Sequence, residues 1–216
     1  EDESGTLYEM RLSDQKLQKY TFGAAGDYED IALSAKQSFI LSSNGDLTSF
    51  DLKALKAGDS QHIQVLKSVL PKGEYEGLAF SADRTKLLVL CKECKVDKSQ
   101  ESVSLYELAL ENNAVRLVKE VKLDEGAVKT LLGNKKKWRP SALAQHPQSQ
   151  DWYILSSVNK SIVVLDADYK VKSAYKLKHK DYTQPEGIAF DFQSSLWISN
   201  EAGDKNADAT LLKFTQ

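Results

Sequence analysis

Short runs of β-branched, aromatic and aliphatic residues recur along the chain, and many of them alternate with polar residues on a period of two. This alternation is typical of β-strands, because successive side chains of a strand point to opposite faces of its sheet. Turn-forming residues separate the runs, and no long stretch has the 3.6-residue period of an amphipathic helix with caps. The pattern therefore predicts an all-β protein.

One short phrase returns four times and divides the chain into similar units. A second and a third predicted strand follow each copy, and a fourth strand follows in three of the units. The copies are EDIALS at 29–34, EGLAFS at 76–81, SALAQH at 141–146 and EGIAFD at 186–191. Their first residues are 47, 65 and 45 positions apart. Four short strands in a unit of about 45 residues are the signature of a β-propeller blade.

The two ends of the chain predict a further blade. GTLYEMRL and KLQKYTF precede the first copy and have the pattern of the third and fourth strands of a blade. We therefore expect one domain, a five-bladed β-propeller with four-stranded antiparallel blades, whose first blade lacks about 35 to 45 residues preceding Glu1. The expected parts are a partial blade 1 at about 5–23, blade 2 at 28–70, blade 3 at 75–123, an insertion with a short helix at 124–138, blade 4 at 140–178 and blade 5 at 185–216.

The bulk properties narrow the classes of function. A chain of 216 residues is long enough to bury one large core. Its 29 Lys and Arg residues against 31 Asp and Glu residues give a formal net charge of −2, so it lacks the basic excess that binds nucleic acid. Apolar runs are far shorter than the roughly 20 residues that cross a bilayer. We expect a monomer without a transmembrane segment or a nucleic-acid partner.

The two cysteines, Cys91 and Cys94, form a CKEC motif. Such a pair is found in zinc ribbons and redox couples. A zinc site needs four ligands, and the sequence offers no second pair of this kind. Redox pairs lie at helix N-termini, whereas the residues before Cys91 have the pattern of a strand. An incidental pair at a strand end is the favoured interpretation.

Three of the four copies open with a glutamate, and these are Glu29, Glu76 and Glu186. The first strand of each propeller blade lines the central channel, so symmetry brings the three carboxylates to one channel mouth. Glu93 and Glu201 come just past the ends of second strands and are expected at the same mouth. The repeat therefore predicts a ring of acidic side chains.

A hard divalent cation would relieve the mutual repulsion of these carboxylates. Calcium suits such a ring best, because it accepts six to eight oxygen ligands in irregular geometry, whereas magnesium needs a tighter octahedron. The absence of clustered His or Cys residues argues against zinc, copper or nickel. The alternative is that each glutamate pairs with a neighbouring cation such as Lys92 or Arg139.

The fourth copy departs from the others, because Arg139, Pro140 and Ser141 stand where the other copies have an acid. Arg139 is thus a candidate ligand-binding residue. Tyr28 and Tyr75 precede two of the glutamates. Aromatic rings at a channel mouth can stack on a planar ligand, although packing between blades explains them equally well.

The phrases themselves resemble a known family. YEGLAFS at 75–81, followed by a Lys-Glu pair, and QPEGIAFD at 184–191, followed by LWISNEAG, are similar to the SdiA-regulated (YjiK-like) family of bacterial five-bladed propellers, which are distantly related to NHL repeats. The resemblance extends from Gly5 to Thr215. It implies a calcium ion near the five glutamates named above, and an exported protein, periplasmic or lipid-anchored at the cell envelope, whose leader is not part of this chain.

We expect a non-enzymatic protein that binds calcium and also binds a protein, glycan or small ligand at its channel mouth. The alternative is a calcium-dependent hydrolase of the phytase-like or lactonase-like type, with Glu76 or Glu186 as the general base. No Ser, His and Asp arrangement or nucleophile elbow supports this alternative. Because fold analogy does not decide function, binding is preferred to catalysis.

Overall fold

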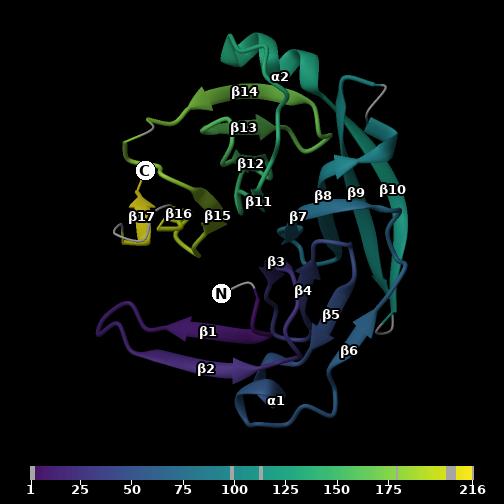
Figure 1. The fold of residues 1–216 in the computed structure, drawn as a ribbon, viewed down its shortest axis with the longest axis vertical. Helices are drawn as coiled ribbons and strands as arrows, with labels where there is room; N and C mark the ends of the chain where they lie inside the picture. Colours follow the sequence, from purple (N-terminus) through teal and green to yellow (C-terminus); the bar gives the residue numbers. More distant parts are fainter. Residues whose placement is uncertain (1–2, 98–99, 112–113, 179, 203–207, 216) are drawn as a thin grey trace.

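The computed structural model describes residues 3–97, 100–111, 114–178, 180–202 and 208–215. Their strands form five antiparallel sheets arranged in a ring, as in a β-propeller (Figure 1). Four of these sheets have three or four strands each, as propeller blades do, whereas the remaining sheet has only two strands. The all-β class and the propeller arrangement are confirmed, and four blades are clear in the described residues. The predicted partial blade 1 coincides with the two-stranded sheet.

The sheets follow one another in chain order. The two-stranded sheet contains β1 (Thr6–Met10) and β2 (Leu17–Thr21). The next contains β3 (Tyr28–Ala32), β4 (Ser38–Ser42), β5 (Leu47–Phe50) and β6 (Gln64–Leu66). Then come β7 (Gly73–Phe80), β8 (Lys86–Cys94), β9 (Ser102–Glu111) and β10 (Ala114–Asp124). The fourth sheet contains β11 (Ala142–Gln145), β12 (Trp152–Ser156), β13 (Ser161–Leu165) and β14 (Val171–Lys176). The last sheet contains β15 (Pro185–Phe190), β16 (Leu196–Asn200) and β17 (Thr210–Phe214).

The repeated phrase forms the inner strand of each blade. Its copies lie on β3, β7, β11 and β15, which face the centre of the ring, while β6, β10 and β14 are outermost (Figure 1). Neighbouring strands pair in sequence order, so each blade is a simple meander. The first strands of neighbouring blades also contact one another, as β3 does with β7 and β11 does with both β7 and β15. This arrangement gathers equivalent positions of the repeat around one axis.

Within the described ranges, two short helices and one 3₁₀ turn interrupt the strands. Helix α2 (Glu125–Leu132) lies in the predicted insertion; the Asp124 side chain caps its first turn, and Gly133 ends it in a left-handed conformation with φ 57°. Helix α1 (Leu52–Lys56) lies between β5 and β6 and was not predicted, because its five residues are too few to show a helical period. The 3₁₀ turn, η1 (Lys95–Asp97), follows β8. No helix of the described part is long and apolar enough to cross a membrane.

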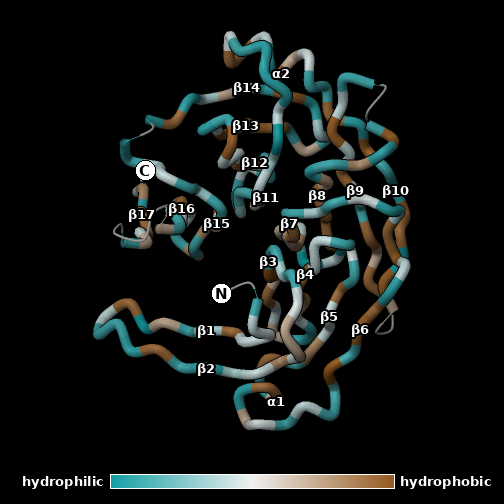
Figure 2. The backbone as a smooth tube through the Cα atoms, in the orientation of Figure 1, coloured by the Kyte–Doolittle hydropathy of each residue, from teal (hydrophilic) through white to brown (hydrophobic). Residues whose placement is uncertain are grey.

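The core lies in layers between adjacent sheets rather than in one central mass. Hydrophobic residues recur within the strands in Figure 2, and the largest fully buried side chains include Phe39, Tyr106, Trp138 and Trp152. Burying one such side chain stabilises a fold by about 1.5–3 kcal/mol before the entropy cost of ordering it. Because these residues fill the space between blades, the centre of the ring is left to the polar residues of the inner strands.

Cys91 and Cys94 form a disulfide at the end of β8, so the interpretation of an incidental pair is wrong. Both side chains are about 1% exposed. Gly73 of β7 lies opposite, and a Cβ atom at this position would come 2.5 Å from the Cys94 Sγ atom. The disulfide therefore depends on glycine in the neighbouring strand, which the spacing of the two cysteines alone does not reveal.

Candidate functional site

A β-bulge repeats on three inner strands at the glutamate of the phrase. In β3 the pairing with β4 shifts between Tyr28 and Asp30, which leaves Glu29 as the extra residue. The same shift leaves out Glu76 in β7 and Glu186 in β15. A bulge bends its strand and re-aims a side chain, and bulges are frequent beside functional sites. The three glutamates thus share a backbone device in addition to a position in the repeat.

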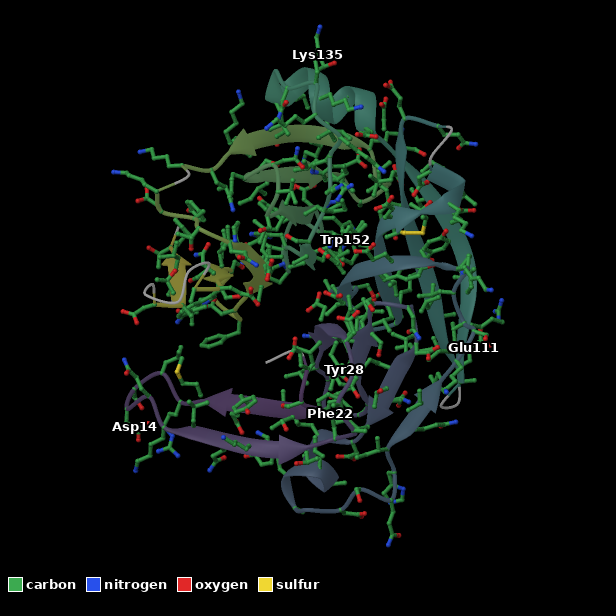
Figure 3. The ribbon with its side chains drawn as sticks, in the orientation of Figure 1. Asp14, Phe22, Tyr28, Glu111, Lys135 and Trp152 are labelled. Atoms are coloured by element: carbon green, nitrogen blue, oxygen red, sulfur yellow. A yellow bond between two sulfur atoms is a disulfide. The ribbon has the colours of Figure 1, made fainter. Side chains whose placement is uncertain are left out.

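Most of the predicted site residues line one central cavity of about 610 Å³. The predicted residues among its walls are Tyr28, Glu29, Glu76, Glu186 and Glu201. Tyr28 lies on the inner strand β3, where Figure 3 labels it, and its hydroxyl donates a hydrogen bond to the Ala24 carbonyl oxygen at 2.9 Å. Glu29, Glu76 and Glu186 come from three different copies of the phrase, so the repeat predicted correctly that they converge.

Glu76 is paired with a lysine. Its Oε1 atom accepts a hydrogen bond from Lys92 Nζ, and Lys92 lies 3.1 Å from Glu74 Oε1. Burial raises the pKa of Glu76, although Lys92 opposes the shift. Burial alone would lower the pKa of Lys92, but its bonds and charge interactions with Glu76 and Glu74 raise it overall. At this position the structure has the ion pair that the sequence offered as the alternative to a metal ligand.

Asp30 is a cavity residue that the sequence analysis did not single out. Its carboxylate accepts hydrogen bonds from the backbone N–H groups of Ile31 and Leu78, both at 2.7 Å. Burial, with a contribution from the charge of Glu29, raises the pKa of Asp30 to about 7, against the lowering effect of the two hydrogen bonds. The only signal in the sequence was its place directly after Glu29 in EDIALS, and the bulge is what brings both acids to the cavity.

Glu186 and Glu201 converge on a single amide group. Gln184 donates from its Nε2 atom to Glu186 Oε1 at 3.0 Å and to Glu201 Oε2 at 2.8 Å. The backbone N–H of Glu201 also donates to the Gln184 carbonyl oxygen at 2.9 Å. This small network positions two carboxylates from β15 and the end of β16 on one side of the central cavity.

A second cavity, of about 310 Å³, adjoins the first and shares five of its wall residues: Glu76, Lys92, Ser141, Gln184 and Glu186. It adds two cationic residues, Arg139 and Lys160, together with Ser157, Val158 and Thr183. Arg139 is therefore a cavity residue, as predicted. No histidine or cysteine is among the described residues that line either cavity.

Two predicted site residues lie elsewhere. Tyr75 is fully buried in the core between blades, and its hydroxyl donates to the Pro71 carbonyl oxygen at 2.6 Å, so the prediction that it contacts a ligand is wrong. Tyr75 instead packs against Tyr106 in the hydrophobic core, with ring centroids 5.9 Å apart. Glu93 is among the wall residues of neither described cavity, and its Oε2 atom lies 3.8 Å from Arg139 Nη2.

The carboxylates do not form one compact ligand cluster. Among the described residues, the only three His, Cys, Asp or Glu side chains with ligand atoms within 4.8 Å of one another are Cys91, Cys94 and Asp97. Two of these three are joined as the disulfide. The donor chemistry of the central cavity still suits a hard cation, because its ligand atoms are carboxylate, amide and hydroxyl oxygens. A symmetric calcium site made of Glu29, Glu76 and Glu186 does not agree with the structure, because Glu76 already forms an ion pair with Lys92.

The sequence profile of the SdiA-regulated family matches residues 1–203. The chain belongs to the SdiA-regulated family. This finding confirms the resemblance of its repeated phrases, and it covers all four copies together with both cavities.

Solved structures similar to this SdiA-regulated protein support the propeller fold. A protein of unknown function from Bacteroides caccae is 8% identical, with 97% of this chain and 70% of that chain covered and a TM-score of 0.57. A nidogen/laminin complex is 12% identical, with 92% of this chain and 69% of that chain covered and a TM-score of 0.51. A catalytically inactive virginiamycin B lyase from Staphylococcus aureus with quinupristin is 11% identical, with 99% of this chain and 64% of that chain covered and a TM-score of 0.53. At these identities the likeness concerns the fold alone. No curated protein matches the chain significantly.

Proposed function

We propose that this SdiA-regulated protein is a non-enzymatic binding propeller that holds a calcium ion in its central cavity and binds a small ligand beside it. One observation carries the proposal: five carboxylates, those of Glu29, Asp30, Glu76, Glu186 and Glu201, line one cavity together with a single lysine. Such an excess of negative charge in partly buried surroundings favours a cation.

The ligand set that we propose differs from the one the repeat suggested. Lys92 already neutralises Glu76, so the proposed ligands are Glu29 and Asp30 from β3 together with Glu186 and Glu201. Because no three of these described side chains have ligand atoms within 4.8 Å of one another, we propose that they move together when the ion binds. Burial, with a smaller contribution from the charge of Glu29, raises the pKa of Asp30, and a bound cation would stabilise its charged form. Calcium is preferred to magnesium because it accepts several carboxylates in irregular geometry.

The size of the cavity favours a small ligand over a protein or a glycan chain. Small-molecule sites are typically concave and about 300–1,000 Å³ in volume, and the central cavity of about 610 Å³ falls within this range. We further propose five blades, with β1 and β2 as the outer strands of the fifth, because this sheet lies in the ring between the β3–β6 and β15–β17 sheets (Figure 1).

We also propose that the protein works in the cell envelope. The Cys91–Cys94 disulfide supports this location, since disulfides persist in oxidising compartments such as the periplasm and are rare in reducing ones. Localising a tagged full-length protein by cell fractionation tests the proposal. Recovery in the cytosolic fraction, with both thiols reduced, would contradict it.

Thermal melting with calcium and then with a chelator tests the ion. We expect millimolar calcium to raise the melting temperature, since a ligand at about 100 times its Kd adds about 2.7 kcal/mol to the free energy of unfolding. Glu29→Gln and Glu186→Gln should remove most of this shift. Glu111→Gln is the matched control, because it makes the same change at an exposed residue that Figure 3 places at the rim, paired with Arg116. An unchanged calcium shift in both cavity variants would refute the site.

A further inference from the structure

The smaller cavity differs in charge from the larger one that it adjoins. Its walls carry three cations, Lys92, Arg139 and Lys160, and two acids, Glu76 and Glu186, so its formal charge is +1. The central cavity has five acids and one cation. A ligand that spans the two cavities therefore meets positive potential at one end and negative potential at the other.

Among the described residues, two of the three cations are less closely paired with an anion than the third. Lys92 is committed to Glu76 and Glu74. Arg139 forms an ion pair with Glu93 at 3.8 Å, a separation beyond direct hydrogen bonding. No described carboxylate forms an ion pair with Lys160, whose Nζ atom donates to the Thr183 carbonyl oxygen. Burial lowers the pKa of Lys160, and the charge of Glu186 only partly offsets this effect.

The backbone around both cations is held in place. The Asn159 side chain accepts a hydrogen bond from the Arg139 N–H at 3.0 Å and another from Ser156 Oγ at 2.9 Å, and it donates to the Lys137 carbonyl oxygen at 3.1 Å. The adjacent Lys160 has a φ of 45°, a left-handed conformation that non-glycine residues adopt rarely. Asn159 thus fixes the backbone of Arg139 next to the turn that carries Lys160, and both cations line the same cavity.

We propose that the smaller cavity is a carboxylate subsite, in which Arg139 and Lys160 bind the acid group of a small polyhydroxylated carboxylic acid. The guanidinium fork of arginine matches a carboxylate in geometry. The proposal deepens the proposed function, because it rests on ligand binding beside the central cavity and names the class of ligand.

The charge and the lining both favour this class. A formal charge of +1 matches one carboxylate, whereas a phosphate dianion would leave one negative charge uncompensated beside Glu76 and Glu186. Ser141, Ser157, Thr183 and Gln184 offer hydroxyl and amide groups for the hydroxyls of the ligand. The rest of the ligand then extends into the central cavity, where the Tyr28 ring lines the wall.

Three probes with one sugar scaffold test the subsite by isothermal titration calorimetry in calcium: glucuronate, glucose and glucose 6-phosphate. We expect glucuronate to bind at least about ten-fold more tightly than either of the others, since one favourable charged contact is worth about that factor. Equal binding of glucose would overturn the carboxylate assignment, as would tighter binding of glucose 6-phosphate or no binding of glucuronate at millimolar concentration.

Variants connect the preference to the proposed residues. Arg139→Gln and Lys160→Gln should each weaken glucuronate binding about ten-fold and leave glucose unchanged, while Arg139→Lys keeps part of the preference. Lys135→Gln is the matched control, because Lys135 is exposed at the end of the α2 region, far from the ring centre (Figure 3). Full glucuronate affinity in both cavity variants would refute the subsite.

The calcium shift of each variant is measured in parallel by thermal melting. A retained calcium shift in a variant that has lost glucuronate binding assigns the loss to the carboxylate subsite and leaves the calcium proposal standing. If calcium does not raise the melting temperature of the wild-type protein although that protein binds glucuronate, the calcium proposal is refuted and the carboxylate subsite stands.

Discussion

At the scale of single residues, Asp30 gives the clearest pH dependence. Its pKa in the folded protein is about 7, above the ordinary value of 3.8. Between about pH 4 and pH 7 the folded state therefore holds a proton that the unfolded state has released. The free energy of unfolding should fall as pH rises through this window and level off above it.

Asp30→Asn tests this expectation in the presence of a chelator. Asparagine does not titrate, so the variant should lose most of the fall in stability between about pH 4.5 and pH 7.5, as measured by urea denaturation. One of the two backbone N–H groups loses its acceptor, so the variant should be less stable than wild type at the lower pH by about 1 kcal/mol. Asp14→Asn, at an exposed carboxylate of the β1–β2 turn, is the control and should keep the slope. An unchanged slope in Asp30→Asn would show that another group carries the pH dependence.

The same residues show how far the sequence could predict the site. The repeat placed Glu29, Glu76 and Glu186 correctly at the central cavity, because equivalent positions of a propeller repeat meet around the axis. The sequence offered Lys92 as a partner for a glutamate but could not decide between this ion pair and a metal ligand at Glu76, since the contact depends on the register between β7 and β8. Asp30 was missed because a bulge breaks the simple alternation of inward and outward side chains.

At the scale of elements, the β7–β8 pair joins a disulfide to the cavity wall. Lys92 lies between Cys91 and Cys94 in the sequence, so the disulfide constrains the backbone that carries the partner of Glu76. Its effect on stability should be moderate, because the closed loop is short. The chain-entropy estimate for so small a loop is about 2 kcal/mol.

Burial should protect this disulfide from reduction in the folded protein. Both cysteines are about 1% exposed, so a small dithiol reaches them only when β7 and β8 separate. Thiol titration after incubation with dithiothreitol should find little reduction in buffer and complete reduction in urea. Cys91→Ala with Cys94→Ala should lower the free energy of unfolding by about 2 kcal/mol and leave the protein folded. Equal rates of reduction in buffer and urea would contradict the buried position.

The elements also show what a pattern of residues can and cannot convey. Strand order and strand type followed from alternation and spacing, because each unit repeats the same meander. The disulfide did not follow, because a CxxC motif is compatible with several outcomes. The structure resolves this ambiguity with a bond between the two cysteines, next to which only a glycine fits at position 73.

At the scale of the whole molecule, stability is expected to be uneven around the ring. The β7–β10 sheet contains a deeply buried run: residues 87–91 of β8 are each at most 1% exposed. The β1–β2 sheet has no buried residue in either strand, and Met10, Leu12 and Leu17 are about half exposed there. Its attachment to the ring depends on a small cluster around Phe22 and on the ion pair of Lys56 with Glu9.

Amide hydrogen exchange should reveal this gradient. Exchange follows local opening, whose free energy is low where few apolar contacts must be broken and approaches the global value in buried strands. We expect the amides of β1 and β2 to exchange fastest among the strands, and those of β8 and β9 to exchange only on global unfolding. Phe22→Ala should speed exchange in β1 and β2 and leave β8 unchanged, because Phe22 packs on the cluster beside α1 and not on the β7–β10 sheet. Protection of β1 and β2 equal to that of β8 would mean that the ring opens as one cooperative unit, and its cavity walls would then be as rigid as its core.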